Sequence, residues 1–155
     1  MIEYPGYSIY AGTATEDNIV NDIDPVWNFV TRIMRFDRND VIVMGRSIGS
    51  GASIHLAHQH YCGGLILISP FTSLKSAAEH NFTKIASMLV KERFDNLTKM
   101  KSIKAPCLFI HGKEDSLVPY EHSKALYGNL VCLIRRGLSK TSGNTNIFRY
   151  DPSIL

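Results

Sequence analysis

A short apolar run at residues 41–44 stops at a Gly-x-Ser-x-Gly motif, and this junction restricts the fold more than any other stretch of the chain. The valines and isoleucine before the motif favour a β-strand, and the small residues after it favour a helix packed closely on that strand. Gly45 and Gly49 leave room for a tight turn around Ser47. The sequence therefore predicts a strand, a sharp turn and a helix, with the serine hydroxyl held out of the sheet.

Two other interpretations of the motif stay open at this point. Because Gly-x-Ser-x-Gly is short and arises often by chance, the serine could be incidental to an ordinary strand-to-helix turn. A phosphate-binding loop would have a lysine after its last glycine, where this chain has Ala52. The apolar run before the motif favours the third interpretation, a strained turn that exposes Ser47 to a base as a nucleophile.

Three more apolar runs predict an α/β domain. Residues 65–68, 107–110 and 130–134 have the composition of buried strands, and helical stretches long enough for crossovers separate them. We expect these runs and residues 41–44 to form one mainly parallel sheet flanked by helices. Residues 135–155 are expected to form a polar loop and a weakly structured tail.

A helix is expected before the first of these strands, with Thr15 as its N-cap and acidic residues in its first turn. Five apolar residues recur at helical spacing and are expected to face the core: Ile19, Ile23, Trp27, Val30 and Met34.

Composition excludes several classes of protein. At 155 residues and 45% hydrophobic content, the chain is long enough for one domain with a core. Its 17 basic and 14 acidic residues are spread without long runs, so no nucleic-acid surface is predicted. No stretch approaches the ~20 apolar residues of a membrane span, and no signal segment opens the sequence. A cytoplasmic location is expected, with peripheral membrane association left open.

Cysteine and histidine do not predict a metal site. The three cysteines, Cys62, Cys107 and Cys132, are unrelated in spacing, so reduced core residues are expected rather than disulfides. His55, His58 and His60 lie on a predicted helix but have no adjacent cysteine or carboxylate in a zinc-binding pattern. Neither a metal nor a cofactor is therefore expected.

Four segments, in their order and spacing, resemble the α/β-hydrolase superfamily and are most similar to its α/β-hydrolase domain-containing proteins, which include protein depalmitoylases. The segments are residues 4–7, 45–49, 69–72 and 111–115. The pattern His-Gly-x-x-Asp-x-x-Val, which begins at residue 111, resembles the acid loop of that family. The resemblance implies a partial α/β-hydrolase domain over residues 1–138 and a polar C-terminal tail over residues 139–155.

Carried over residue by residue, the resemblance implies a serine hydrolase site. Ser47 falls on the nucleophile, and Asp115 falls on the acid that orients the base. The backbone N–H of Ile48 falls on one half of the oxyanion hole. The implied substrate is an acyl ester or thioester, such as a lipidated protein, and no cofactor is implied.

Two departures from the family pattern bear on activity. The family's first strands and its second oxyanion N–H would lie before Met1, so the first strand of this sheet is expected to have a bare edge. Lys140 occupies the position of the family's catalytic histidine, and no histidine follows His122. Lys140 and His122 are the alternative bases. Two hypotheses follow: a serine hydrolase, or a truncated or degenerate inactive relative that acts at most as a binding protein.

Overall fold

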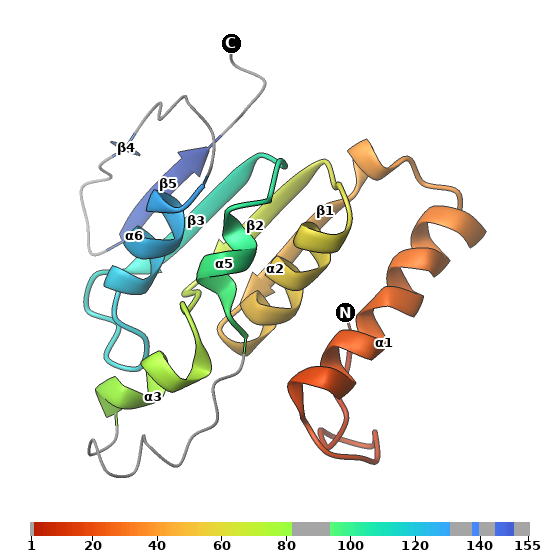
Figure 1. Cartoon of the computed structure of the whole chain (residues 1–155), viewed down its shortest axis with the longest axis horizontal. Helices are drawn as coiled ribbons and strands as arrows, with labels where there is room; N and C mark the ends of the chain where they lie inside the picture. The colour runs from red at the N-terminus through yellow and green to blue at the C-terminus, as the bar shows by residue number, and fades with distance from the viewer. Residues whose placement is uncertain (1, 82–93, 131–137, 140–144, 151–155) are drawn as a thin grey trace.

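The chain folds around one five-stranded sheet with the strand order β1-β2-β3-β5-β4 (Figure 1). The structure is a computed structural model that describes residues 2–81, 94–130, 138–139 and 145–150. The strands are β1 (Ile42–Arg46), β2 (Gly64–Ile68), β3 (Cys107–Gly112), β4 (Leu138–Ser139) and β5 (Thr145–Tyr150). The α-helices are α1 (Glu16–Asn28), α2 (Ile48–Gln59), α3 (Leu74–Asn81), α5 (Asn96–Met100) and α6 (Glu121–Gly128), with a π-helical turn at Phe29–Ile33 and a 3-10 turn at Arg38–Asp40.

The parallel core of the sheet is the one that the apolar runs predict. β1 pairs in parallel with β2, and β2 pairs in parallel with β3. The register aligns Gly45 with Leu67 and Leu67 with Phe109. The predicted strands at 41–44, 65–68 and 107–110 are confirmed to within two residues at each end, and the prediction of a mainly parallel α/β sheet is confirmed with them.

The C-terminal part of the sheet differs from the expectation. Residues 145–150, which were expected to be part of a weakly structured tail, form β5 and pair antiparallel with β3, while β4 pairs antiparallel with β5. The physical reason is that Thr145–Tyr150 is rich in β-branched and aromatic residues and meets a free edge of β3. Of the predicted strand at 130–134, Leu130 is in no strand, and the rest lies outside the described residues.

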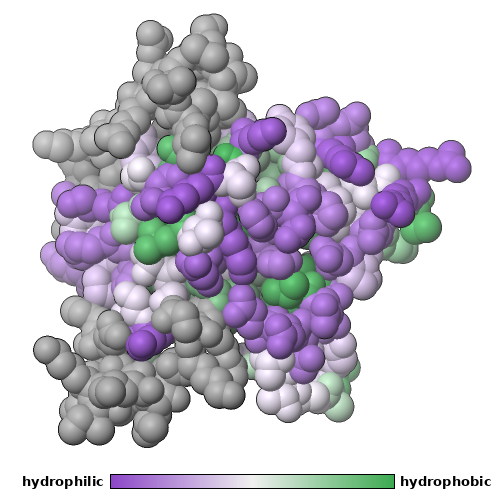
Figure 2. All heavy atoms as spheres, in the orientation of Figure 1, coloured by the Kyte–Doolittle hydropathy of each residue, from purple (hydrophilic) through white to green (hydrophobic). Residues whose placement is uncertain are grey.

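Helices cover one face of the parallel strands. α2, α5 and α6 lie over the face turned towards the viewer in Figure 1, and their outer surface is largely hydrophilic (Figure 2). Leu65, Leu67 and Phe109 point to the helix-covered side and are fully buried. The alternate residues Ile42 and Met44 are 63% and 65% exposed, so the outer edge of the sheet at β1 carries uncovered apolar side chains.

The first helix begins at the predicted N-cap, but its buried face ends earlier than predicted. Thr15 caps α1 by accepting a hydrogen bond from the Asn18 N–H at 3.2 Å. Ile19, Ile23 and Trp27 are buried, but Met34 is exposed. The wider turn of the π-helix at Phe29–Ile33 shifts the side chains that follow it around the helix axis, so the predicted core stripe ends at Trp27.

Candidate active site

Ser47 occupies a strained turn between β1 and α2. Its backbone has φ 48° and ψ −120°, a conformation that a residue with a side chain rarely adopts. The Ser47 N–H donates to the Ile68 carbonyl at 3.0 Å, and the Ser50 N–H and hydroxyl donate to the Ser47 carbonyl at 2.8 and 2.6 Å. The predicted strand, turn and helix are thus confirmed, and the Ser47 residue is exposed.

The glycines of the motif have different roles. A Cβ atom on Gly45 would overlap the Gly49 carbonyl oxygen and lie 2.5 Å from the Ser53 hydroxyl. Gly45 is therefore required for the close approach of α2 to β1. A Cβ atom on Gly49 would meet only the Tyr4 hydroxyl, at 3.4 Å, which is an ordinary contact. The position of Gly49 could therefore hold a side chain, but its backbone carbonyl leaves no space for a side chain at Gly45.

Asp115 lies in the loop after β3, where neighbouring N–H groups hold its carboxylate. One carboxylate oxygen accepts hydrogen bonds from the Leu117 and Val118 N–H groups, each at 3.0 Å. Burial favours a higher pKa for Asp115, but hydrogen bonds from the Val118 N–H and the Ser69 hydroxyl outweigh it. The Leu117 N–H and the His111 ring act in the same direction, so the pKa lies below the ordinary value of 3.8 and the carboxylate is ionised at neutral pH.

His111, at the end of β3, holds the start of the acid loop through hydrogen bonds. Its ring is 1% exposed, with Nε2 2.7 Å from the Val118 carbonyl and Nδ1 2.6 Å from the Ser123 hydroxyl on α6. Because a carbonyl only accepts, Nε2 carries the proton, and in the neutral ring Nδ1 accepts from Ser123. Nε2 also lies 3.6 Å from the Asp115 carboxylate. His111 therefore ties β3, the acid loop and α6 together.

Ser47 and Asp115 open onto the same edge of the sheet. Both follow the carboxyl ends of parallel strands, the edge where α/β folds bind ligands. Ser69 lies at the same edge, directly after β2, and its φ is 45°. Its N–H donates to the Ile110 carbonyl at 2.9 Å, and its hydroxyl lowers the pKa of Asp115. The sequence signal that could have identified Ser69 is its position as a polar residue directly after the apolar run at 65–68.

Of the two alternative bases, the structure describes only His122. Lys140 lies outside the described residues. His122, on α6, is buried, and its Nδ1 lies 2.9 Å from the Thr72 hydroxyl and accepts from the Thr72 N–H at 3.3 Å. His122 is thus engaged with the segment after β2. Ile48 is the first residue of α2, so its N–H lies at the helix end where backbone donors are unpaired and the dipole favours an anion.

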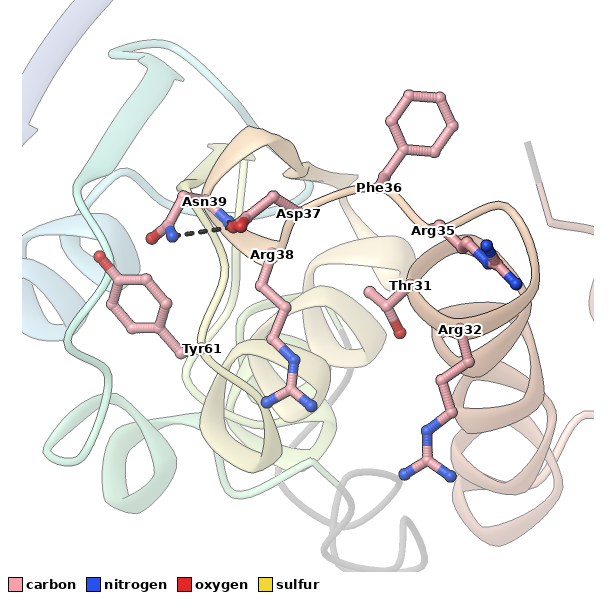
Figure 3. Close-up of a pocket in the computed structure, with 8 residues that line it drawn as sticks. All are labelled: Thr31, Arg32, Arg35, Phe36, Asp37, Arg38, Asn39 and Tyr61. Atoms are coloured by element: carbon pink, nitrogen blue, oxygen red, sulfur yellow. Dashed lines mark hydrogen bonds between the residues drawn. The ribbon is translucent and has the colours of Figure 1, made fainter.

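Two pockets lie at opposite ends of β1. An apolar pocket of about 680 Å³ borders the turn, with Gly45, Ile48 and Tyr4 among its lining residues. Burial, and then the neighbouring Tyr7, raise the pKa of Tyr4. A polar pocket of about 540 Å³ lies beside the loop that precedes β1 (Figure 3) and belongs to a different part of the molecule.

The described residues contain no group of three histidine, cysteine or acidic side chains arranged as metal ligands. None of their helices is both long enough and apolar enough to span a membrane.

A parallel sheet with a strained serine turn after one strand and a hydrogen-bonded acid loop after another is the arrangement of the α/β hydrolases, and the chain is an α/β hydrolase in fold. Solved structures of this fold match it. The uncomplexed acylaminoacyl peptidase of Pyrococcus horikoshii is 22% identical with a TM-score of 0.60, over 76% of this chain and 22% of that one. The esterase domain of a Rhodothermus marinus protein is 14% identical with a TM-score of 0.55, over 71% and 52%.

Within that class, the sequence is similar to the α/β-hydrolase domain-containing proteins 17, which confirms the resemblance seen in the motifs. The mouse protein 17C is 30% identical over 125 residues, which are 81% of this chain and 38% of the relative. The human protein 17B is 33% identical over 125 residues, which are 81% of this chain and 42% of the relative. The chain thus spans about two fifths of the length of these relatives. No protein-family model matches it.

Proposed function

We propose that the chain carries the nucleophile and acid of a serine hydrolase that cleaves acyl esters or thioesters. The observation that supports this most directly is that the strained Ser47 turn and the ionised Asp115 carboxylate both follow the carboxyl ends of parallel strands, at one edge of the sheet. A strained, exposed serine on such a turn is the arrangement that makes a hydroxyl reachable by both substrate and base.

In the proposed reaction the Ser47 hydroxyl oxygen attacks the acyl carbon while its proton passes to a base that Asp115 orients. The Ile48 N–H donates to the oxygen that becomes negatively charged. The leaving alcohol or thiol takes up a proton, and water then releases the acid from Ser47. The base is Lys140, at the position of the family's histidine, or His122. The apolar pocket beside Ile48 is within the usual size of ligand sites and suits an acyl chain. This supports a lipidated protein as the particular substrate.

The second candidate is an inactive relative that keeps the site but has lost its base. The observation that favours it is that Lys140 stands where the resemblance places the catalytic histidine. Lys140 has to lose its proton to act as a base, and lysine does so near neutral pH only when buried or beside other cations. This candidate retains at most the binding of an acyl chain or a partner.

A fluorophosphonate probe and a short-chain thioester substrate together distinguish the two. The probe is expected to label the chain at Ser47, with labelling lost in Ser47→Ala and kept in Ser102→Ala, an exposed serine outside the site. Absence of Ser47-dependent labelling would refute the hydrolase proposal.

Thioester turnover then tests the base. If the chain is the inactive relative, it is expected to hydrolyse the thioester little faster than Ser47→Ala, because Lys140 stands at the position of the family's histidine. Clear Ser47-dependent turnover would contradict this expectation and exclude the inactive relative. Its loss in Lys140→Ala, but not in His122→Asn, would then identify lysine as the base.

A further inference from the structure

Three arginines surround the polar pocket beside the loop that precedes β1. Arg32 lies in the π-helical turn, Arg35 follows it, and Arg38 begins the 3-10 turn, all within one pocket of about 540 Å³ (Figure 3). This loop feeds the amino end of β1, whereas Ser47 follows its carboxyl end. The pocket is therefore separate from the candidate active site, and the proposed hydrolysis does not use it.

The backbone that carries these arginines is fixed by its own hydrogen bonds. The Phe36 N–H donates back to the Val30 carbonyl at 3.2 Å, across Arg35, whose φ is 60°. The Gly63 N–H donates to the Arg38 carbonyl at 2.9 Å. A Cβ atom on Gly63 would overlap the Asn39 carbonyl, so this loop packs directly on the segment before β2. The pocket thus has a defined frame built from two parts of the chain.

The charges in the pocket are not balanced. Among the described residues, no carboxylate forms an ion pair with Arg32, Arg35 or Arg38. Asp37 is the acidic residue in the lining, and its carboxylate accepts from the Asn39 N–H and side-chain amide, each at 2.8 Å. The lining therefore carries an excess of two positive charges, which favours an anionic ligand.

The side chains of the three arginines do not all point the same way. Figure 3 shows the guanidinium groups of Arg32 and Arg38 extending to the same side of the pocket, with Thr31 between them, whereas Arg35 points away at the end of the helix. Two guanidinium groups from neighbouring segments can each give paired N–H donors to a tetrahedral anion. This geometry fits a phosphate group better than a planar carboxylate, which one arginine satisfies.

We propose that Arg32 and Arg38 bind a phosphate group at this pocket, with Arg35 contributing through longer-range attraction. The phosphate is free in solution or carried by a lipid headgroup. Ile33, Met34 and Phe36 are exposed around the arginines, with Ile33 71% exposed, and exposed apolar residues next to basic ones suit a lipid surface.

The test is an NMR titration of the arginine side-chain N–H signals with glycerol 3-phosphate, at low salt and again at physiological salt. Arg32→Gln and Arg38→Gln are each expected to weaken binding about tenfold or more, the usual effect of losing a charge-assisted hydrogen bond. Arg35→Gln should weaken it less. Lys124→Gln, which removes the same charge from an exposed site on α6, should leave binding unchanged.

Equal weakening in all four variants, or no shift of the arginine signals, would overturn the proposal. Sedimentation with phosphatidylcholine vesicles, with and without phosphatidic acid, then identifies the source of the phosphate. Binding that needs phosphatidic acid and falls in Ile33→Ser indicates a headgroup, and titration without vesicle binding indicates a free phosphate. Labelling of Ser47 reports on the other end of β1, so its failure leaves this proposal unaffected.

Discussion

Replacing Gly45 by alanine tests the idea that α2 must touch β1 to form the serine turn. The added Cβ atom would overlap the Gly49 carbonyl oxygen and lie 2.5 Å from the Ser53 hydroxyl and 2.7 Å from the Gly49 carbonyl carbon. Ordinary non-bonded contacts are about 3.5 Å or more, so α2 has to move by about 1 Å. α2 cannot move freely, because more than half of its residues are buried.

Overpacking of a closely packed core costs about 1–3 kcal/mol, and a clash with backbone belongs at the upper end of that range. We therefore expect Gly45→Ala to lower the free energy of unfolding by about 3 kcal/mol in urea, followed by circular dichroism at pH 7. Since Gly49 carries the overlapping carbonyl, the same shift should also displace the backbone around Ser47 and reduce its labelling by the fluorophosphonate probe.

Gly49→Ala is the matched control. The new Cβ atom would meet only the Tyr4 hydroxyl at an ordinary 3.4 Å, and alanine is the better helix residue in α2. Its free energy of unfolding should be unchanged or up to about 1 kcal/mol higher. The reasoning is refuted if Gly45→Ala costs less than about 1 kcal/mol, or if the two variants lose stability equally.

Three other predictions concern buried polar and thiol groups. His111→Leu leaves the Val118 carbonyl and the Ser123 hydroxyl buried without partners, so urea unfolding should show a loss of about 2–4 kcal/mol, and a loss below 1 would contradict this. The pKa of Asp115 is depressed in the folded chain, so the stabilisation by its carboxylate is present above pH 3.8 and is lost as the pH falls through the lower folded pKa. The difference in unfolding free energy between wild type and Asp115→Asn should therefore shrink between pH 5 and pH 2. A difference that stays constant over this range would refute the prediction. Burial raises the pKa of the Cys107 thiol, so native protein at pH 8 should resist iodoacetamide at this position until urea exposes it, as peptide mapping would show.

The parallel strands were predictable because each is a continuous run of apolar residues next to a turn signal. Their exact ends were not, because Gly64 and Gly112 join the ladder through backbone hydrogen bonds that composition does not show. β5 was missed for a related reason. It pairs with β3 across more than thirty intervening residues, with Cys107 opposite Tyr150, and its polar flanks outweighed its β-branched and aromatic content.

The site was predictable where the chemistry lies next to a strand end and unpredictable where it depends on contacts across the fold. Ser47 and Asp115, which the resemblance to the family selects as candidates, each lie shortly after a strand that the apolar runs predict. His111 bonds to the Val118 carbonyl in its own loop, but its second bond, to Ser123, depends on the position of the next helix. The effect of Ser69 on the pKa of Asp115 depends on β2 and β3 being neighbours in the sheet.

The strain at Ser47 and Ser69 follows from the way the sheet continues past its strands. Both residues have a positive φ, and both donate their N–H to a carbonyl in the C-terminal half of the next strand, Ser47 to Ile68 and Ser69 to Ile110. Such a conformation costs about 1–3 kcal/mol, and it persists because the surrounding hydrogen bonds and the Gly45 contact determine it. None of these interactions involves a catalytic base. The serine turn therefore forms whether or not a base is present, which is why labelling of Ser47 and turnover of substrate are separate tests and have to be measured separately.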